Sequence, residues 1–165
     1  MDKKHFEFHY GIYTDASELA AEDRQLLEAA RKVTALAYAP YSDFRVGAAA
    51  RLVNGTIMEG TNQENASYPV GICAERSLLA AAGTLYPNMA ITTMAISYKN
   101  LNKEGGSDHP ISPCGMCRQA LQEYEDRTGQ PIRLILSGQE GSIYIIEKAG
   151  HLLPLAFSGN EFKNK

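Results

Sequence analysis

Residues of alternating hydrophobicity recur along the chain in short segments, which is the pattern of strands that bury one face. In the first of these segments, residues 6–12, every second side chain is aromatic or isoleucine. Asn54-Gly55 is a strong hairpin signal between two of the later segments. The predicted strands cover residues 6–12, 45–53, 56–60, 91–97, 132–136 and 142–147.

Longer segments with the apolar spacing of helices separate several of these strands. The first predicted helix extends from a cap at Asp15 or Ser17 to about Ala39, where Pro40 ends it. Two more helices begin near residues 72 and 114. From residue 56 to residue 136 the order is therefore strand, helix, strand, helix, strand, which implies right-handed crossovers and helices packed on a mixed sheet. We expect an α/β fold.

The third predicted helix has clear signals at both ends. Ser112 and Pro113 are its expected cap and first helical position. It continues to about Thr128, and Gly129 is its expected stop. These signals place the PCGMC segment, residues 113–117, at the start of the helix.

The composition is that of one globular domain. The chain has 165 residues, of which 44% are hydrophobic, and it contains no repeat or low-complexity segment. We see no domain boundary within it. We expect residues 1–15 to form an N-terminal arm or an extra edge strand, and residues 16–165 to form a single domain.

Charge and apolar runs exclude several classes of protein. The net charge is −3 and no basic block occurs, which argues against a nucleic-acid partner. No apolar run approaches the ~18 residues of a membrane span, and no signal peptide opens the sequence. Three cysteines fit thiol chemistry in a reducing cytoplasm better than a disulfide framework. We expect a cytoplasmic protein.

The three cysteines are the candidate metal ligands. Cys114 and Cys117 are three apart, so on a helix they share one face and can bind the same ion. Cys73 lies at the predicted start of the second helix, where unpaired N–H groups lower thiol pKa values. Three thiolates suit zinc and leave its fourth position open for water. The alternative is a closed structural zinc site, and His109 is the one histidine near either segment.

Glu75 and Arg76, which follow Cys73-Ala74, also fit a catalytic zinc site. Glu75 lies close enough to contact a metal-bound water without ligating, and a carboxylate there can accept and deliver protons. Its simpler role is a first-turn acid that stabilises the helix dipole. Three thiolates leave a zinc site with about one net negative charge, which Arg76 can offset. The simpler role of Arg76 is an ordinary surface residue.

Four motifs in a fixed order resemble those of cytidine deaminases. They are YSDFRVGAA at residues 41–49, NQENASYP at 62–69, CAER at 73–76 and PCGMCRQ at 113–119. The resemblance covers about residues 20–157 and is most similar to the small, homotetrameric, three-Cys branch of the family. The order of all four motifs makes it specific.

The resemblance implies a three-layer αβα sandwich around a mixed five-stranded sheet, to which residues 1–15 add a short extension. It implies zinc-dependent hydrolytic deamination of cytidine, and also of deoxycytidine, to the uracil nucleoside and ammonia in pyrimidine salvage. One zinc ion per subunit, a small-molecule nucleoside substrate, a homotetramer and no nucleic-acid or membrane partner are also implied. The residues implied are the metal ligands Cys73, Cys114 and Cys117; catalytic Glu75; Arg76 for the metal's charge balance; and Phe44, Asn62, Glu64, Ala74 and Phe157 for substrate binding.

The substrate-binding residues also have simpler alternative roles. In the family the positions of Asn62 and Glu64 bind ribose hydroxyls, chiefly the 3′-OH, but the two residues could instead stabilise their own loop. Phe44 matches the aromatic that packs on the pyrimidine and could be an ordinary core residue. Phe157 matches a residue that reaches a neighbouring subunit's site and could simply pack at the C-terminal end.

Two other functions stay open at this point. One is a zinc deaminase for another substrate, such as an aminonucleoside antibiotic or a cytosine in a polynucleotide. The acidic charge balance and the Asn62–Glu64 pair count against it. The other is a structural zinc module for protein contacts, against which the small number of cysteines counts.

Overall fold

One six-stranded sheet lies at the centre of the molecule in the computed structural model, which describes residues 1–102 and 106–162. The strand order is β1-β6-β5-β4-β2-β3, so β2, β4, β5 and β6 are the inner strands. Among these strands β4 and β5 are parallel, and the other neighbouring pairs are antiparallel. The strands are β1 (Gly11–Tyr13), β2 (Phe44–Leu52), β3 (Ile57–Thr61), β4 (Ile91–Asn100), β5 (Arg133–Ser137) and β6 (Ile143–Ile146).

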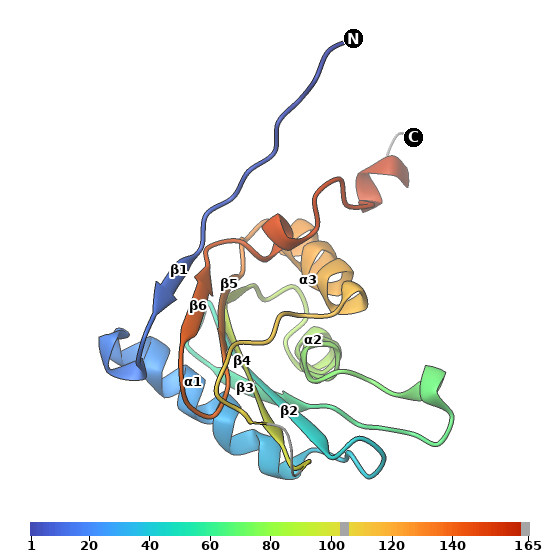
Figure 1. Ribbon diagram of the computed structural model, residues 1–165. Helices are drawn as coiled ribbons and strands as arrows, with labels where there is room; N and C mark the ends of the chain where they lie inside the picture. Colours follow the sequence, from blue (N-terminus) through green and yellow to red (C-terminus); the bar gives the residue numbers. More distant parts are fainter. Residues whose placement is uncertain (103–105, 163–165) are drawn as a thin grey trace.

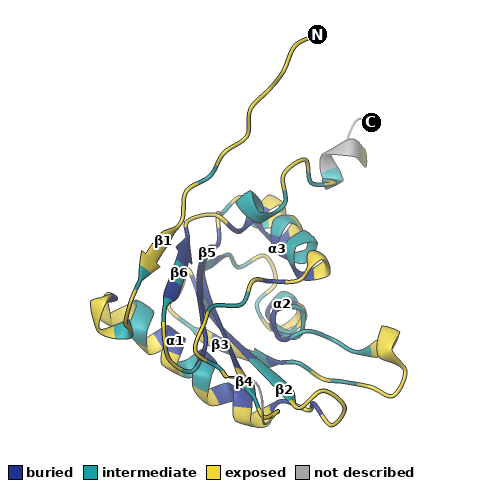
Figure 2. Ribbon diagram, in the orientation of Figure 1, coloured by how far each residue is buried: buried dark blue, intermediate teal, exposed yellow. Residues whose placement is uncertain are grey.

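Helices cover both faces of this sheet. Helix α1 (Ala21–Val33) packs on one face, and α2 (Ala74–Leu85) and α3 (Gly115–Thr128) pack on the other (Figure 1). Each face has its own core, one containing Leu27 and Ile135, the other Leu78 and Leu121. In Figure 2 the buried residues lie on the inner strands of the sheet and on the helices that pack against it. The predicted three-layer α/β sandwich is confirmed, and none of the described helices has the length and apolarity to cross a membrane.

The sheet has one strand more than the five of the predicted sandwich, because the N-terminal extension contributes β1. In the pairing with β6, Gly11 lies opposite Ile145 and Tyr13 opposite Ile143. The predicted strand over residues 6–12 therefore begins too early. The pairing with β6 begins at the Gly11–Ile145 pair, so the residues before Gly11 lie outside the sheet.

The first helix is shorter than predicted at both ends. Asp15 does act as a cap, but for a single 3₁₀ turn, η1 (Ala16–Glu18). Leu19 then adopts an extended conformation with its side chain buried, which separates this turn from α1. At the other end α1 passes into a second 3₁₀ turn, η2 (Thr34–Leu36), so the predicted continuous helix to Ala39 is wrong.

The third helix begins two residues later than predicted. Its N-cap is Cys114, with extended backbone angles (φ −67°, ψ 169°), and not Ser112. Cys73 is likewise the N-cap of α2. Gly129 ends α3 in the left-handed conformation (φ 67°), as predicted. Two candidate ligands thus lie at helix tips, and Cys117 lies in the first turn of α3.

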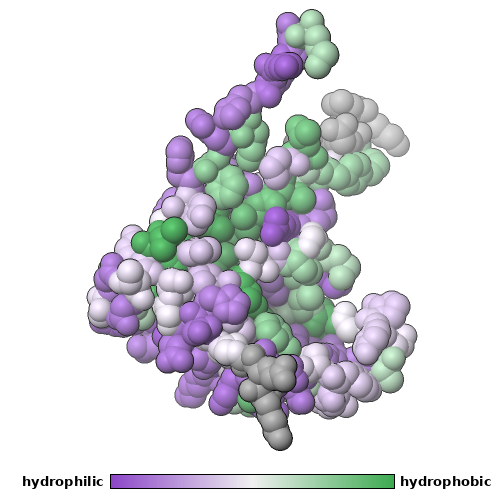
Figure 3. All heavy atoms as spheres, viewed as in Figure 1, coloured by the Kyte–Doolittle hydropathy of each residue, from purple (hydrophilic) through white to green (hydrophobic). Residues whose placement is uncertain are grey.

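Residues 1–10 form an extended arm that leaves the sheet (Figures 1 and 3). The ring of Tyr10 lies 5.2 Å from that of Tyr144 on β6, and the ring of Phe8 lies 6.1 Å from that of His151. The alternate aromatic side chains of the arm therefore lie beside β6 and the segment after it. The division into residues 1–15 and 16–165 stays a prediction.

Glycine at two positions of the sheet allows the helices to approach closely. A Cβ atom at Gly47 would lie 2.3 Å from the carbonyl oxygen of Ala30 on α1. A Cβ atom at Gly60 would lie 2.7 Å from the carbonyl oxygen of Ala74, the first residue of α2. Gly60 therefore sets how closely the N-terminal end of α2 approaches the sheet.

We expect Gly60→Ala to lower the free energy of unfolding by about 1–3 kcal/mol, because the added methyl group must displace the first turn of α2. Gly115→Ala is the matched control, since a Cβ atom there meets no atom within 4 Å. Thermal unfolding of the zinc-loaded proteins measures both effects. Equal unfolding temperatures for the two variants would contradict the role given to Gly60.

Candidate metal centre and active site

Three thiol groups gather at the N-terminal ends of α2 and α3. The Sγ atoms of Cys73 and Cys114 are 3.7 Å apart and those of Cys114 and Cys117 are 3.4 Å apart. All three lie within 4.8 Å of one another, the one such group of possible metal ligands among residues 1–102 and 106–162. Sulfurs bound at 2.3 Å to a tetrahedral zinc ion are about 3.8 Å apart. Both the spacing and the donor chemistry fit zinc.

The surroundings of the cluster favour the loss of thiol protons, which metal binding requires. Cys73 and Cys114 are N-caps, so the positive ends of two helix dipoles lie at these residues. Hydrogen bonding with the neighbouring Cys117 thiol lowers the pKa of Cys73 to about 6. The same interaction, together with burial, raises the pKa of Cys117. Of these two thiols, Cys73 is therefore the one that loses its proton more readily.

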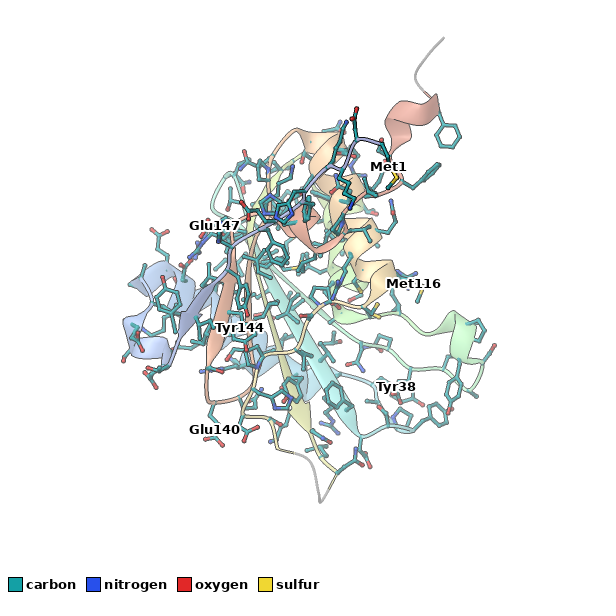
Figure 4. The ribbon with its side chains drawn as sticks, turned by 45° about the horizontal axis from the view of Figure 1, so that its top comes forward. Met1, Tyr38, Met116, Glu140, Tyr144 and Glu147 are labelled. Carbon is teal, nitrogen blue, oxygen red and sulfur yellow. The ribbon has the colours of Figure 1, made fainter. Side chains whose placement is uncertain are left out.

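A cavity of about 400 Å³ opens over the cluster. Cys73 and Cys114 line it, whereas Cys117 is fully buried behind them. Met116 lies at its edge, at the start of α3 (Figure 4). A small molecule can therefore reach the cluster from one side, and Cys117 closes the opposite side. This is the arrangement of a catalytic metal site with an accessible coordination position.

The carboxyl group of Glu75 shares the cavity with the thiols. Glu75 lies in the first turn of α2 and is only 5% exposed. Burial raises the pKa of this carboxyl group, and hydrogen bonding and the charge of Arg76 oppose the rise less strongly. A buried acid of raised pKa beside a metal site is suited to accepting and releasing a proton.

The sequence of this chain matches a known family over the same region. A family model described as the cytidine and deoxycytidylate deaminase zinc-binding region matches residues 20–129, which include all three cysteines and Glu75. The chain belongs to this deaminase family. The family resemblance predicted from the four motifs is confirmed, and the zinc-binding description agrees with the thiol cluster.

Relatives match most of the chain. A cytidine deaminase of Sporosarcina psychrophila is 35% identical over 81% of this chain and 90% of its own length. One of Halalkalibacterium halodurans is 35% identical over 86% of this chain and 99% of its own. Among solved structures, the cytidine deaminase of Burkholderia pseudomallei has a TM-score of 0.69 at 36% identity, covering 81% of this chain and 97% of that chain. That of Mycobacterium tuberculosis has a TM-score of 0.63 at 29% identity, covering 84% and 98%.

Asn62 and Glu64 of this deaminase line the cavity, and both also fix the loops around it. The Asn62 side chain accepts from the N–H of Val46 (2.7 Å) and donates to the carbonyl of Phe44 (3.0 Å). The Glu64 carboxylate accepts from the N–H of Tyr41 (2.9 Å). Loop stabilisation is therefore present, and it holds the two side chains at the cavity wall.

The two arginines near the cluster make other contacts. Arg76 points its Nη1 at the Met116 sulfur, 3.9 Å away, while its charge also lowers the pKa of Cys73. Arg118 donates to the carbonyl oxygens of Pro113 (2.9 Å) and Leu152 (3.0 Å). Arg76 thus acts on the thiols through charge at a distance, and Arg118 fixes the chain before α3.

Two of the predicted substrate residues lie away from the cavity of the single chain. The Phe44 ring stacks on Tyr98 at 4.9 Å. Phe157 is 61% exposed and contacts Phe162, while its carbonyl accepts from the Gln119 amide. The roles predicted for both aromatics in substrate binding stay proposals.

The cavity also contains residues that the sequence did not single out. Ile111, Ser112 and Met116 line it from both sides of Cys114, and Tyr68 lines it from the loop before α2. Because Ile111 and Ser112 are close to Cys114 in sequence, their position beside the metal site was predictable. The position of Tyr68 was not predictable, since it depends on the path of an irregular loop.

Removal of zinc should destabilise the protein measurably. A ligand at 100 times its Kd stabilises by about 2.7 kcal/mol, which corresponds to a Tm change of about 5–11 °C for a chain of this size. We therefore expect chelation to lower the Tm by at least this amount, and added Zn²⁺ but not Mg²⁺ to restore it. A Tm unaffected by chelation, in protein shown to have lost its metal, would contradict a zinc site formed by the three thiols.

Proposed function

We propose that this chain is a zinc-dependent cytidine deaminase. It converts cytidine and deoxycytidine, with water, to uridine and deoxyuridine plus ammonia, a reaction of pyrimidine nucleoside salvage. The observation that carries the proposal is the cavity in which the accessible side of a three-thiol cluster meets the buried carboxyl group of Glu75. Zinc, when bound, supplies a Lewis acid that brings the pKa of a coordinated water to about 7.

Glu75 carries the protons in this proposal. It accepts one proton from the attacking water and delivers it to N3 of the ring as the C4–O bond forms. It then accepts the second proton from the hydroxyl now bound at C4 and gives it to the amine, so the C4–N bond breaks and the amine leaves as ammonia. One water is consumed for each ammonia released. The raised pKa that burial gives Glu75 suits a group that must both accept and release a proton.

The walls of the cavity provide the groups that recognise the nucleoside. Asn62 and Glu64 bind the ribose, chiefly its 3′-hydroxyl, with the acceptor and donor positions that their loop contacts leave free. Ala74 lies at the N-terminal end of α2 and lines the cavity beside Glu75. Phe44 packs near the pyrimidine, and Arg76 offsets the negative charge of the three thiolates.

The assembly is proposed to be a homotetramer in the cytoplasm. The exposed Phe157 ring supports self-association, because it can then reach the cavity of a neighbouring subunit. The three free thiols support a reducing compartment, since two pairs of their sulfur atoms already lie within 3.7 Å.

Glu75→Gln tests the catalytic role. The variant should keep one zinc ion per chain and still bind nucleoside, while turnover of cytidine falls by at least about 10²–10⁴. The loss of cytidine absorbance together with ammonia release measures turnover. Glu59→Gln, at an exposed position of β3, is the matched control and should retain the original rate.

Either of two results would overturn this proposal. Near-normal turnover by Glu75→Gln would remove Glu75 from the mechanism. Rapid deamination of cytosines in single-stranded DNA, without activity on free cytidine, would identify a different substrate.

Glu64→Ala separates ribose binding from loop stabilisation. If Glu64 binds the 3′-hydroxyl, the KM for cytidine should rise about tenfold or more, as expected for a hydrogen bond to a charged group. The KM for 3′-deoxycytidine should change little. A role restricted to holding the Tyr41 N–H would raise both KM values equally, and that result would contradict ribose binding.

A further inference from the structure

The segment from Gly106 to Ser112 connects β4 to α3 and forms part of the cavity wall. Ile111 and Ser112 at its end line the cavity directly before the ligand Cys114. The position of this segment therefore determines the shape of the site on one side. It is fixed by contacts on two sides, neither of which involves the thiol cluster or Glu75.

The first contact is with the turn between β5 and β6, which Glu140 marks in Figure 4. The carbonyl oxygen of Ser107 accepts from the N–H groups of Gln139 (2.6 Å) and Glu140 (3.3 Å). A Cβ atom at Gly138 would lie 2.0 Å from that same oxygen. The segment thus rests on the turn so closely that residue 138 must be glycine.

The second contact is a hydrogen bond to β4. The side chain of Tyr98 is 1% exposed, and its hydroxyl lies 3.1 Å from Nδ1 and 3.3 Å from Nε2 of His109. A carboxylate oxygen of Asp108 also lies 3.1 Å from Nδ1. Because a carboxylate can only accept, Nδ1–H donates to Asp108, and the same imidazole is hydrogen-bonded to the Tyr98 hydroxyl. His109 therefore joins the segment to the buried tyrosine.

Tyr98 connects this segment to the opposite wall of the cavity. Its ring stacks on Phe44 at 4.9 Å and 16° between planes. The carbonyl of Phe44 accepts from the amide of Asn62, which lines the cavity. One buried tyrosine therefore contacts the segment through its hydroxyl and the start of β2 through its ring.

We propose that the Tyr98–His109 hydrogen bond is a positioning device for nucleoside binding. This hydrogen bond sets the separation of two cavity walls to the one that the substrate requires. Ile111 and Ser112 lie on one wall, and Asn62, hydrogen-bonded to Phe44, lies on the other. His109 and Tyr98 touch neither the metal ligands nor Glu75, so they act on affinity and not on the chemical step. This inference rests on the proposed deaminase function.

The geometry permits a clean test because the His109 side chain is 65% exposed. Its removal costs little packing, and the main loss is the bond to Tyr98. Tyr98→Phe deletes the same bond from the other side and keeps the ring that stacks on Phe44. The test series consists of the two single variants, their double variant and His109→Gln. Glutamine keeps a polar side chain that can accept from the tyrosine hydroxyl.

For His109→Ala we expect the KM for cytidine and the Kd for uridine to rise between about two- and tenfold, the range for one net hydrogen bond. The kcat should stay within about twofold and the zinc content at the wild-type level. Tyr98→Phe should give the same result, and the double variant should be no worse than either single one. His109→Gln should restore part of the affinity. His9→Ala, a histidine of the exposed N-terminal arm, is the control and should match the wild type.

Three outcomes would overturn the positioning role. They are wild-type KM and Kd in both single variants, additive losses in the double variant, and a fall in kcat equal to the rise in KM. A wild-type protein that neither deaminates cytidine nor binds uridine would instead refute the proposed function. The wild-type assay thus separates the two failures.

Discussion

The site depends on holding three mutually repelling sulfur atoms together. Thiolates at separations of 3.4–3.7 Å are unfavourable unless an ion or surrounding dipoles offset their charge. The chain provides such dipoles, since Cys73 and Cys114 are the N-caps of two helices, whose N-terminal ends carry partial positive charge. The central sheet brings these helix ends together although the two cysteines are 41 residues apart. Gly60 on β3 allows α2 to approach closely enough for this meeting.

Much of this arrangement is predictable from sequence because it depends on local chemistry. The spacing of Cys114 and Cys117, the acid at Glu75 and the hairpin at Asn54-Gly55 each follow from short-range rules. Their predicted places in an α/β fold are confirmed. The errors occur where tertiary contacts override local propensity. Leu19 is extended because its side chain enters the core, and this breaks the first helix into a 3₁₀ turn and α1.

The contacts that hold several cavity side chains in place were not predictable. Sequence offered ribose binding and loop support as alternatives for Asn62 and Glu64, but loop support proves to be what holds both at the cavity wall. The hydrogen bond between Tyr98 and His109 joins residues 11 apart in sequence, and no periodic pattern predicts it. Long connections of this kind are positioned by individual contacts, such as that of Ser107 with the β5–β6 turn. The arm of residues 1–10 is a further case, since apolar alternation begins at Phe6 but pairing with β6 begins only at Gly11.

The central claim is that three thiolates leave one coordination position of zinc open toward the cavity. X-ray absorption at the zinc edge of the purified protein tests it most directly. The account predicts one zinc ion per chain with three sulfur neighbours at about 2.3 Å and one oxygen at about 2.0 Å that a bound nucleoside analogue perturbs. Protein without stoichiometric zinc, or a spectrum of four protein ligands that does not respond to the analogue, would contradict it.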